Sequence, residues 1–316
     1  MTAASYDKLY YFAATVLPYF HFQISGLIGD NFTKCPDKAL ELEVRKLRFI
    51  EEILRYQPTV LCLEEVDLFP YLKETLTKCG YVGIFYPKPD SPCLGNPYNH
   101  GPDGCAIFYN SSKLKVVKSE KLNLKAWNWE TNQVAVICHF QTKSDISKDF
   151  TVAATHFKAG YKEYRPCEDI RKEQAMFLTR YLKEFYGEHP LVLCGDLNFP
   201  CTELGYDIFK CSDLRLTSAY THLSADRQEP EYTFWTINEM EQRKTIDYIW
   251  YTKKGLKVKS VLNIPSEEEA GEGRLPSLKY PSDHLSLVCD FALEDDLEQP
   301  PHYVEETRDS GGCLCL

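Results

Sequence analysis

The chain has 316 residues, of which 44% are hydrophobic and 26% charged, and its formal net charge is -10. These proportions are ordinary for a soluble globular protein. Proteins that hold nucleic acid by charge alone draw most of their affinity from Lys and Arg, so the acidic balance excludes that class. A nucleotide, or a short RNA end held in a local basic pocket, remains compatible with the composition.

Thirteen cysteines are present, an odd number, and the sequence contains no Cys-x-x-Cys pair. Their spacing disfavours both a disulfide scaffold and a zinc site built from thiolates. We expect free thiols in a reducing, intracellular compartment. In apolar, strand-like runs a free thiol behaves as a small hydrophobic side chain, and five cysteines occupy such runs: Cys62, Cys105, Cys138, Cys194 and Cys289.

Residues 9–29 include no Asp, Glu, Lys or Arg, and a stretch of that length is able to span a bilayer. Pro18, His21 and Gln23 interrupt its apolar character, and the basic flanks that orient a membrane span are nearly missing. The favoured interpretation is a first core strand with an irregular lead. A membrane-associated segment and an unusual start are the alternatives.

Helical and strand-like patterns alternate downstream, which predicts an α/β fold. Helices are predicted from Cys35 to Gln57, Leu68 to Cys79 and Pro166 to Phe185. The apolar positions are Leu40, Val44, Leu47, Ile50 and Leu54 on the first helix and Ile170, Ala175, Met176, Leu178 and Leu182 on the third. Strands are predicted at 59–63, 81–87, 105–109, 133–137, 150–156, 191–196 and 245–250, and a last strand begins near residue 284.

Three segments follow from these patterns. Residues 1–33 form a variable lead that includes an atypical first strand, residues 34–294 form one domain, and residues 295–316 form an acidic tail without fixed structure. A Pro/Gly/Asn-rich loop at 90–104 is long enough to suggest a functional role.

Side chains suited to catalysis stand at the ends or starts of several strands, where ligands bind in sheet-based folds. Carboxylates with one amide and two imidazoles suit an oxygen-ligated divalent ion and a general base. Gly-x-Ser-x-Gly, Walker and Gly-x-Gly-x-x-Gly motifs are absent, so the set favours phosphate ester hydrolysis by metal-activated water. The alternatives are an Asx turn after a core strand and a structural histidine. The set comprises Glu65, His156, Asp196, Asn198, Asp247, Asp283 and His284.

Five segments, in this order, resemble the endonuclease/exonuclease/phosphatase superfamily: Leu-Glu-Glu-Val-Asp at 63–67, Thr-His at 155–156, Gly-Asp-Leu-Asn at 195–198, Thr-Ile-Asp-Tyr at 245–248 and Ser-Asp-His at 282–284. Within its deadenylase-like branch the chain is most similar to the nocturnin-type enzymes, in Phe-Tyr-Pro-Lys-Pro, Gly-Pro-Asp-Gly-Cys-Ala and Thr-His-Phe-Lys-Ala among other segments. The resemblance covers about residues 30–293. It implies an α/β, four-layer sandwich of two mixed β-sheets flanked by α-helices.

The resemblance also implies which residues hold the metal. Glu65 binds Mg²⁺, for which Mn²⁺ is a substitute, Asp283 assists at the metal side, and Asp196 orients or deprotonates the attacking water. In the family, the Asn of a Trp-Asn pair on the first strand helps to hold the metal. Residues 19–26 have no Asn, and Gln23 offers the same carbonyl on a side chain one methylene longer.

The other implied roles concern the substrate. Asn198 and His156 contact the phosphate, while His284, steered by Asp247, stabilises the developing charge. A fixed His–carboxylate pair controls the charge and tautomer of the imidazole, and donors aimed at developing negative charge lower the barrier. The lysines that grip additional phosphates correspond to Lys88 and Lys158.

The implied activity is Mg²⁺-dependent hydrolysis of the 2′-phosphate of NADP(H) to give NAD(H), in the cytoplasm. A 3′ exoribonuclease acting on poly(A) is the first alternative, and a catalytically weakened paralogue that only binds its ligand is the second. No stable duplex nucleic acid is expected as a partner. Gly160 stands where nocturnin-type enzymes have an arginine that helps to hold the dinucleotide, and Lys162 and Arg165 are the candidates to replace it.

The last four residues, Cys313-Leu314-Cys315-Leu316, fit the C-a-a-X pattern of prenylation. This pattern predicts weak membrane attachment through a prenylated Cys313, with Cys315 as the acceptor of the second lipid that stable anchoring needs. A chance match is the alternative. Mitochondrial and membrane-associated localisation are therefore the alternatives to cytoplasmic localisation.

Overall fold

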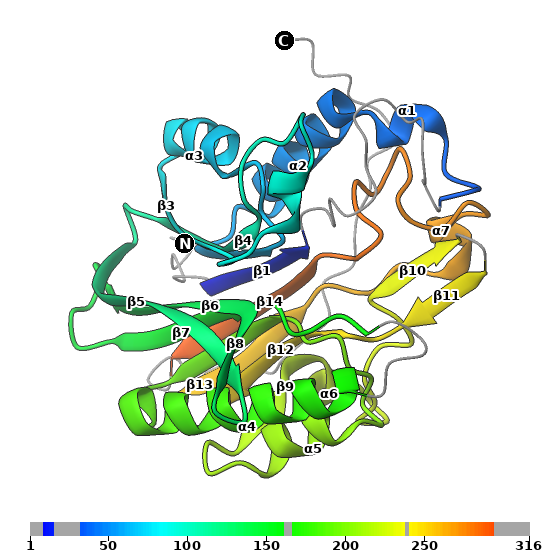
Figure 1. Cartoon of the computed structure of the whole chain (residues 1–316). Helices are drawn as coiled ribbons and strands as arrows, with labels where there is room; N and C mark the ends of the chain where they lie inside the picture. The colour runs from blue at the N-terminus through cyan, green and yellow to red at the C-terminus, as the bar shows by residue number, and fades with distance from the viewer. Residues whose placement is uncertain (1–8, 16–31, 161–165, 238–239, 294–316) are drawn as a thin grey trace.

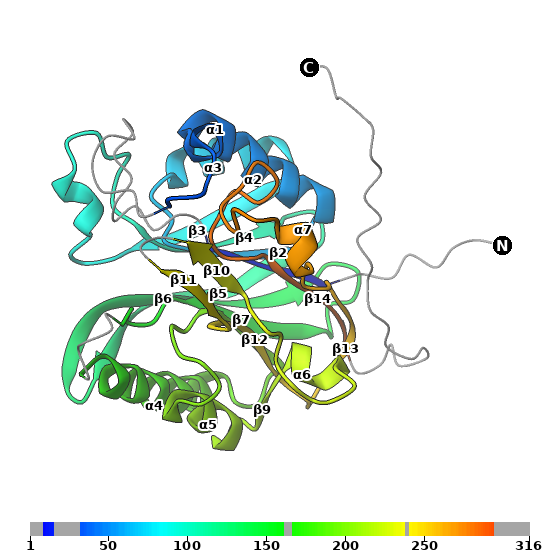
Figure 2. The ribbon, with the colours of Figure 1, turned by 90° about the vertical axis from the view of Figure 1, so that its right-hand side faces the viewer.

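A computed structural model describes residues 9–15, 32–160, 166–237 and 240–293 of the chain. Two six-stranded sheets pack face to face, and helices cover the outer face of each sheet (Figure 1). Figure 2, turned by 90°, shows the four layers edge-on, with α2 (Leu42–Tyr56) and α3 (Phe69–Lys78) on one side and α4 (Pro166–Tyr186) and α5 (Leu204–Cys211) on the other. The predicted four-layer sandwich is confirmed.

The first sheet has the strand order β13-β14-β1-β2-β4-β3. Its β1–β2 pair is parallel and its other pairs are antiparallel, so the sheet is mixed. Its strands are β1 (Leu9–Thr15), β2 (Val60–Glu64), β3 (Tyr81–Pro87), β4 (Gly104–Asn110), β13 (Leu256–Val261) and β14 (Leu287–Leu293).

The second sheet has the order β5-β6-β7-β8-β12-β9, and here only β7 and β8 are parallel. Its strands are β5 (Leu114–Ala126), β6 (Trp129–Thr142), β7 (Asp149–Thr155), β8 (Leu191–Asp196), β9 (Leu216–Ser218) and β12 (Asp247–Thr252). The short elements are the β10–β11 ribbon (Phe234–Ile237 and Glu241–Lys244), the helices α1 (Asp37–Leu40), α6 (Ala219–Leu223) and α7 (Glu267–Ala270), and the 3₁₀ helix η1 (Pro92–Gly95).

Strand β2 shows why the central strands read as continuous apolar runs. Successive side chains of a strand point to opposite faces of the sheet. Val60 and Cys62 therefore pack into the core between the two sheets, whereas Leu61 and Leu63 pack under the helices of the first sheet. Both faces are covered, so no position of the strand is free to be polar. The five cysteines expected in such runs are buried and form no disulfide within the described part of the chain.

Helix α4 buries the side that its apolar spacing predicts, since Ala175, Leu178 and Leu182 have no exposed surface. The prediction for α2 was partly wrong. Leu47, expected on the buried side, is 66% exposed. The buried side centres instead on Phe49 and Arg45, whose Nε donates a hydrogen bond to the carbonyl of Pro281 (2.9 Å). Pairing with a distant loop rotates this helix away from the face that its own sequence favours.

The first strand lies earlier than the sequence suggested. β1 ends at Thr15, opposite Glu64 of β2, whereas the atypical strand was expected at residues 19–26. Gln23 and Cys313 lie outside the described residues, so their expected roles in metal binding and lipidation remain predictions. Among the described residues, no helix combines the length and apolar character needed to cross a membrane.

Three strand ends and one strand start meet at one edge of the sandwich. β7 and β8 are parallel, and the N–H of Phe157 donates to the carbonyl of Asp196 (2.9 Å), which brings their carboxyl ends together. β12 runs antiparallel to β8, so its first residue, Asp247, stands opposite Asp196. β2 of the facing sheet delivers Glu65 to the same edge.

Gly195 lies at the contact of β7 and β8 and tests this arrangement. Its φ is +151°, and a Cβ built on it would lie 1.7 Å from the carbonyl oxygen of Thr155. We expect Gly195→Ala to lower the free energy of unfolding by at least about 3 kcal/mol, because the neighbouring backbone cannot yield. Urea unfolding measures the change.

Gly95→Ala is the matched control, because a Cβ at Gly95 meets nothing within 4 Å. This variant should unfold within about 0.5 kcal/mol of the original chain. Equal stability of the two variants would contradict the close approach of the strands at Gly195.

Candidate active site

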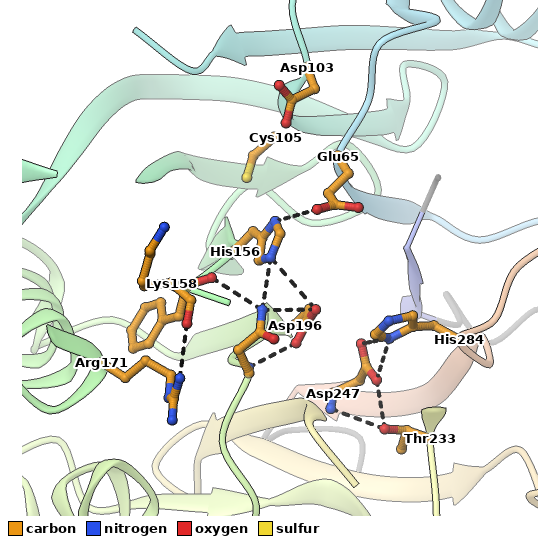
Figure 3. Close-up of polar contacts among 12 residues, drawn as sticks. Glu65, Asp103, Cys105, His156, Lys158, Arg171, Asp196, Thr233, Asp247 and His284 are labelled. Atoms are coloured by element: carbon orange, nitrogen blue, oxygen red, sulfur yellow. Dashed lines mark hydrogen bonds and ion pairs between the residues drawn. The ribbon is translucent and has the colours of Figure 1, made fainter. Parts of the chain in front are cut away.

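Glu65, His156 and Asp196 form a row at the strand ends, with the imidazole in the middle (Figure 3). The Nδ1 atom of His156 lies 3.5 Å from Oε1 of Glu65, and its Nε2 atom lies 3.7 Å from Oδ2 of Asp196. The side chains are only 15%, 5% and 6% exposed, in that order. Residues from three strands of two sheets therefore share one largely water-excluded space.

Asn198 connects this row to the backbone. Its N–H donates to Oδ1 of Asp196 (2.8 Å), which is the Asx turn that the sequence offered as an alternative. Its side-chain nitrogen also lies 2.9 Å from Nε2 of His156, 3.1 Å from Oδ2 of Asp196 and 3.2 Å from the carbonyl of Phe157. The Asx turn is thus part of the candidate site, and the two interpretations of this segment are compatible.

Two site residues adopt a backbone conformation that is uncommon outside glycine. Glu65 and Asn198 both have a φ of +53°. Such conformations cost free energy and cluster at functional sites. Each of them turns the chain directly after its strand.

Asp247 and His284 form a buried pair beside Asp196. The Nδ1 atom of His284 lies 3.0 Å and 2.9 Å from the two carboxylate oxygens of Asp247. Thr233 donates its hydroxyl to Asp247 (2.6 Å) and accepts a hydrogen bond from the N–H of Asp247 (3.1 Å). The partner that the burial of Asp247 requires is therefore His284, and the pair leaves the Nε2 atom of the imidazole for other contacts.

The two histidines are driven to opposite charge states. Burial, and then the nearby charge of Lys88, lower the pKa of His156 well below its ordinary value, so this imidazole is neutral. Burial alone would also lower the pKa of His284, but the carboxylates of Asp247 and Asp196 outweigh it and raise the pKa well above the ordinary value. His284 is therefore the cationic one.

The positive charges of His284 and Lys88 compensate the carboxylates only in part. Burial, and then the charge of Asp247, raise the pKa of Asp196 well above its usual range. Burial also raises the pKa of Glu65 to about 7, although Lys88 acts in the opposite direction. Asp283 is buried, and its negative charge raises the pKa of both Glu65 and His284.

This donor set fits a divalent cation with oxygen ligands, which offsets the mutual repulsion of the carboxylates. Glu65 and Asp283 would hold it. The ligand atoms of Asp196, Asp247 and His284 also lie within 4.8 Å of one another. We interpret that group as a hydrogen-bonded carboxylate–imidazole pair beside a third acid, because the Nδ1 atom of His284 is already engaged by Asp247.

Both predicted lysines border the site. Nζ of Lys88 lies 2.5 Å from Oδ2 of Asp103, and its side chain is 9% exposed. The charge of Lys158 lowers the pKa of His156, and its backbone is held by Gln174, which accepts from its N–H (3.1 Å), and by Arg171, which donates to its carbonyl (3.2 Å). Asp103 thus restrains the first lysine and helix α4 restrains the second.

Several residues of the site were missed by sequence reasoning. Asp103 stands in the Pro-Asp-Gly of the 90–104 loop, a segment that itself carries the family resemblance, and this could have drawn attention to it. Thr233 has no sequence signal. Glu64 is fully buried between the site and the core, and neither of its carboxyl oxygens has a hydrogen-bond partner in the described part of the chain. Burial, and then Asp247, raise its pKa well above the ordinary value.

Comparisons with known proteins agree with this geometry. A family model described as "Endonuclease/Exonuclease/phosphatase family" matches residues 164–284. Nocturnin of Homo sapiens is 46% identical over 281 residues, covering 87% of this chain and 64% of that protein. Nocturnin of Xenopus laevis is 44% identical, covering 87% of this chain and 71% of that protein. The chain therefore spans less than two thirds of the length of the Homo sapiens relative.

Among solved structures, the human nocturnin catalytic domain with a bound sulfate anion superposes with a TM-score of 0.74. It is 38% identical, and the match covers 90% of this chain and 94% of that domain. The match thus includes most of this chain.

Adjacent residues Glu65 and Glu64 provide a matched pair for testing the metal site. Glu65→Gln removes a carboxylate that faces the site, and we expect it to weaken Mn²⁺ binding by about a hundredfold, as loss of a charged ligand does. Glu64→Gln should leave the affinity within about threefold, because a buried, unpartnered carboxyl is already neutral. Calorimetric titration measures both, and equal losses would contradict the assignment of Glu65.

Proposed function

The chain belongs to the endonuclease/exonuclease/phosphatase family, as a relative of the nocturnins, and we propose that it hydrolyses the 2′-phosphate of NADP(H) with the help of Mg²⁺. The observation that carries this proposal is the pairing of a cationic His284 on Asp247 with the buried carboxylates of Asp196 and Glu65. A donor for developing negative charge and a base for water thus lie side by side, as phosphoester hydrolysis requires.

The protein groups divide the work as follows. Asp196 orients the attacking water and takes its proton; burial, and then Asp247, raise its pKa, whereas the positive charge of His284 lowers it and favours the carboxylate that acts as the base. Asn198 and the neutral His156 position the phosphate, since both side chains point to the oxygen of Asp196 that faces the site. His284 donates from Nε2 toward the charge that develops in the transition state, while Asp247 holds its ring in place.

Glu65 and Asp283 are the residues that would hold Mg²⁺. When bound, the cation stabilises charge on the phosphoryl oxygens and lowers the pKa of a bound water. It also offsets the mutual repulsion that raises the pKa of Glu65. The same site tolerates Mn²⁺, which prefers similar ligands.

Charge and enclosure favour a small nucleotide over a polynucleotide. A net charge of -10 disfavours a surface that tracks an RNA backbone, and Lys88 is held inside the site rather than along a groove. The bound sulfate of the human nocturnin domain supports a tetrahedral oxyanion as ligand. Poly(A) hydrolysis from the 3′ end is the second candidate, because the deadenylase-like branch shares the site residues.

The decisive measurement is phosphate release from NADP⁺, with and without Mg²⁺, beside a labelled poly(A) substrate. We expect Mg²⁺-dependent release from NADP⁺ and intact RNA. Asp196→Ala should lower kcat by at least about a thousandfold, since general-base and positioning effects are both lost, without a change in cooperative unfolding.

Three other outcomes would be informative. Shortened RNA with unchanged NADP⁺ would assign the chain to the exoribonucleases. Full activity of Asp196→Ala would overturn the assignment of the base. Inactivity toward both substrates, with folded protein and bound metal, would favour a paralogue that binds without turnover.

Metal binding should depend on pH through Glu65. Its pKa is about 7 in the absence of metal, so below this pH the carboxyl is protonated and the metal must displace a proton. The apparent affinity for Mg²⁺ should therefore fall about tenfold per pH unit below 7 and level off above it. Lys88→Met should move the inflection to higher pH, because the lysine charge lowers the pKa of Glu65. Titration without substrate at several pH values measures both effects.

A further inference from the structure

Three potential metal ligands meet far from the active site, at the opposite ends of the same strands. His139 lies on β6, Asp149 begins β7, and His189 stands two residues before β8. The active-site histidine, His156, follows the other end of β7. Asp149 and His156 are seven positions apart along an extended chain, which is about 23 Å. The group is therefore independent of the active site.

The backbone fixes the positions of all three residues. His139 stands directly opposite Thr151 in the β6–β7 pair, and Gln141 stands opposite Asp149. The N–H of Thr151 donates to the carbonyl of Pro190 (2.7 Å), which ties β7 to the residue after His189. The described strands thus present one ligand from each of three adjacent segments.

The side-chain atoms have the spacing of ligands around one small cation. Oδ1 of Asp149 lies 2.7 Å from Nδ1 of His189 and 3.8 Å from Nε2 of His139, and the ligand atoms all lie within 4.8 Å of one another. Bonds of 2.0–2.1 Å at tetrahedral angles place ligand atoms about 3.3 Å apart. Small side-chain rotations are enough to meet that geometry.

The second nitrogen of one ligand is already oriented. Nδ1 of His139 lies 3.0 Å from the hydroxyl of Thr151, a contact of the kind that fixes the tautomer of metal-binding imidazoles. Its Nε2 atom then faces Asp149.

Solvent reaches the group from one side. The side chains of His139, Asp149 and His189 are 12%, 33% and 41% exposed, respectively. A cation can therefore enter, and a water molecule can complete its coordination. Lys118 stands opposite His139 on β5, and its ammonium is paired with Glu120.

We infer that His139, Asp149 and His189 form a second metal site, selective for Zn²⁺, that is separate from the catalytic centre. Two imidazoles and one carboxylate are borderline ligands that suit Zn²⁺ and disfavour Mg²⁺ and Ca²⁺, which prefer oxygen alone. The bound ion joins the β6–β7 pair to the segment between α4 and β8. It thereby stabilises the start of β8, the strand that carries Asp196.

The test is thermal unfolding of the metal-free chain in the presence of Zn²⁺ or Mg²⁺. At a free Zn²⁺ concentration about a hundredfold above its dissociation constant, Tm should rise by about 5 °C. The rise should vanish in His189→Ala and in His139→Gln. It should persist in His222→Ala, a control in which a half-buried histidine outside the group is removed.

Two further measurements separate this site from the catalytic centre. The Zn²⁺-induced rise should persist in Glu65→Gln, and Co²⁺ used as a probe should give a visible absorption spectrum that His189→Ala abolishes. Without Zn²⁺, His189→Ala should match the Tm and the Mg²⁺-dependent phosphate release of the original chain. An unchanged rise in His189→Ala, its loss in Glu65→Gln, or no rise in the original chain would each overturn the inference.

Discussion

Burial of like charges at one edge of the sandwich is the constraint on which the site depends. Asp196 and Asp247 stand opposite each other on neighbouring strands. Glu65 lies beside them at the end of a strand of the other sheet, and the negative charge of Asp283 raises the pKa of Glu65. Such a group is unfavourable unless positive charge and hydrogen bonds offset the repulsion. His284, Lys88 and the hydroxyl of Thr233 provide part of that offset. The remaining imbalance is what makes a divalent cation a fitting ligand.

The same constraint separates two histidines that the sequence does not distinguish. His284 faces carboxylates that raise its pKa, whereas burial, and then the charge of Lys88, lower the pKa of His156. One imidazole is therefore suited to donate toward negative charge and the other to orient a substrate. Identical side chains acquire different chemistry because the field around them differs. The division requires both sheets, since the charges that set it come from β2, β8 and β12 together.

The strands β7 and β8 organise more than the catalytic edge. Their carboxyl ends hold His156 and Asp196, and their opposite ends gather His139, Asp149 and His189. Both faces of this buried parallel pair are packed, so the two strands are held in place along their whole length. The close approach at Gly195 fixes their separation. The register of β7 and β8 therefore positions the active-site residues at one end and the second group of ligands at the other.

The sequence by itself determined the α/β class, most strand positions and the five short segments that the fold brings to one edge of the sandwich, because strand ends and polar residues are local features. It also indicated that Asp247 needs a partner, since burial of a carboxylate follows from its apolar neighbours. Only the tertiary structure decided which partner that is, which face of α2 is buried, where β1 runs, and that Asp103 and Thr233 belong to the site. These outcomes depend on contacts between residues far apart in the chain, such as Arg45 with Pro281. A local sequence pattern cannot predict such contacts, because the electrostatic field and the packing at each position come from segments elsewhere in the chain.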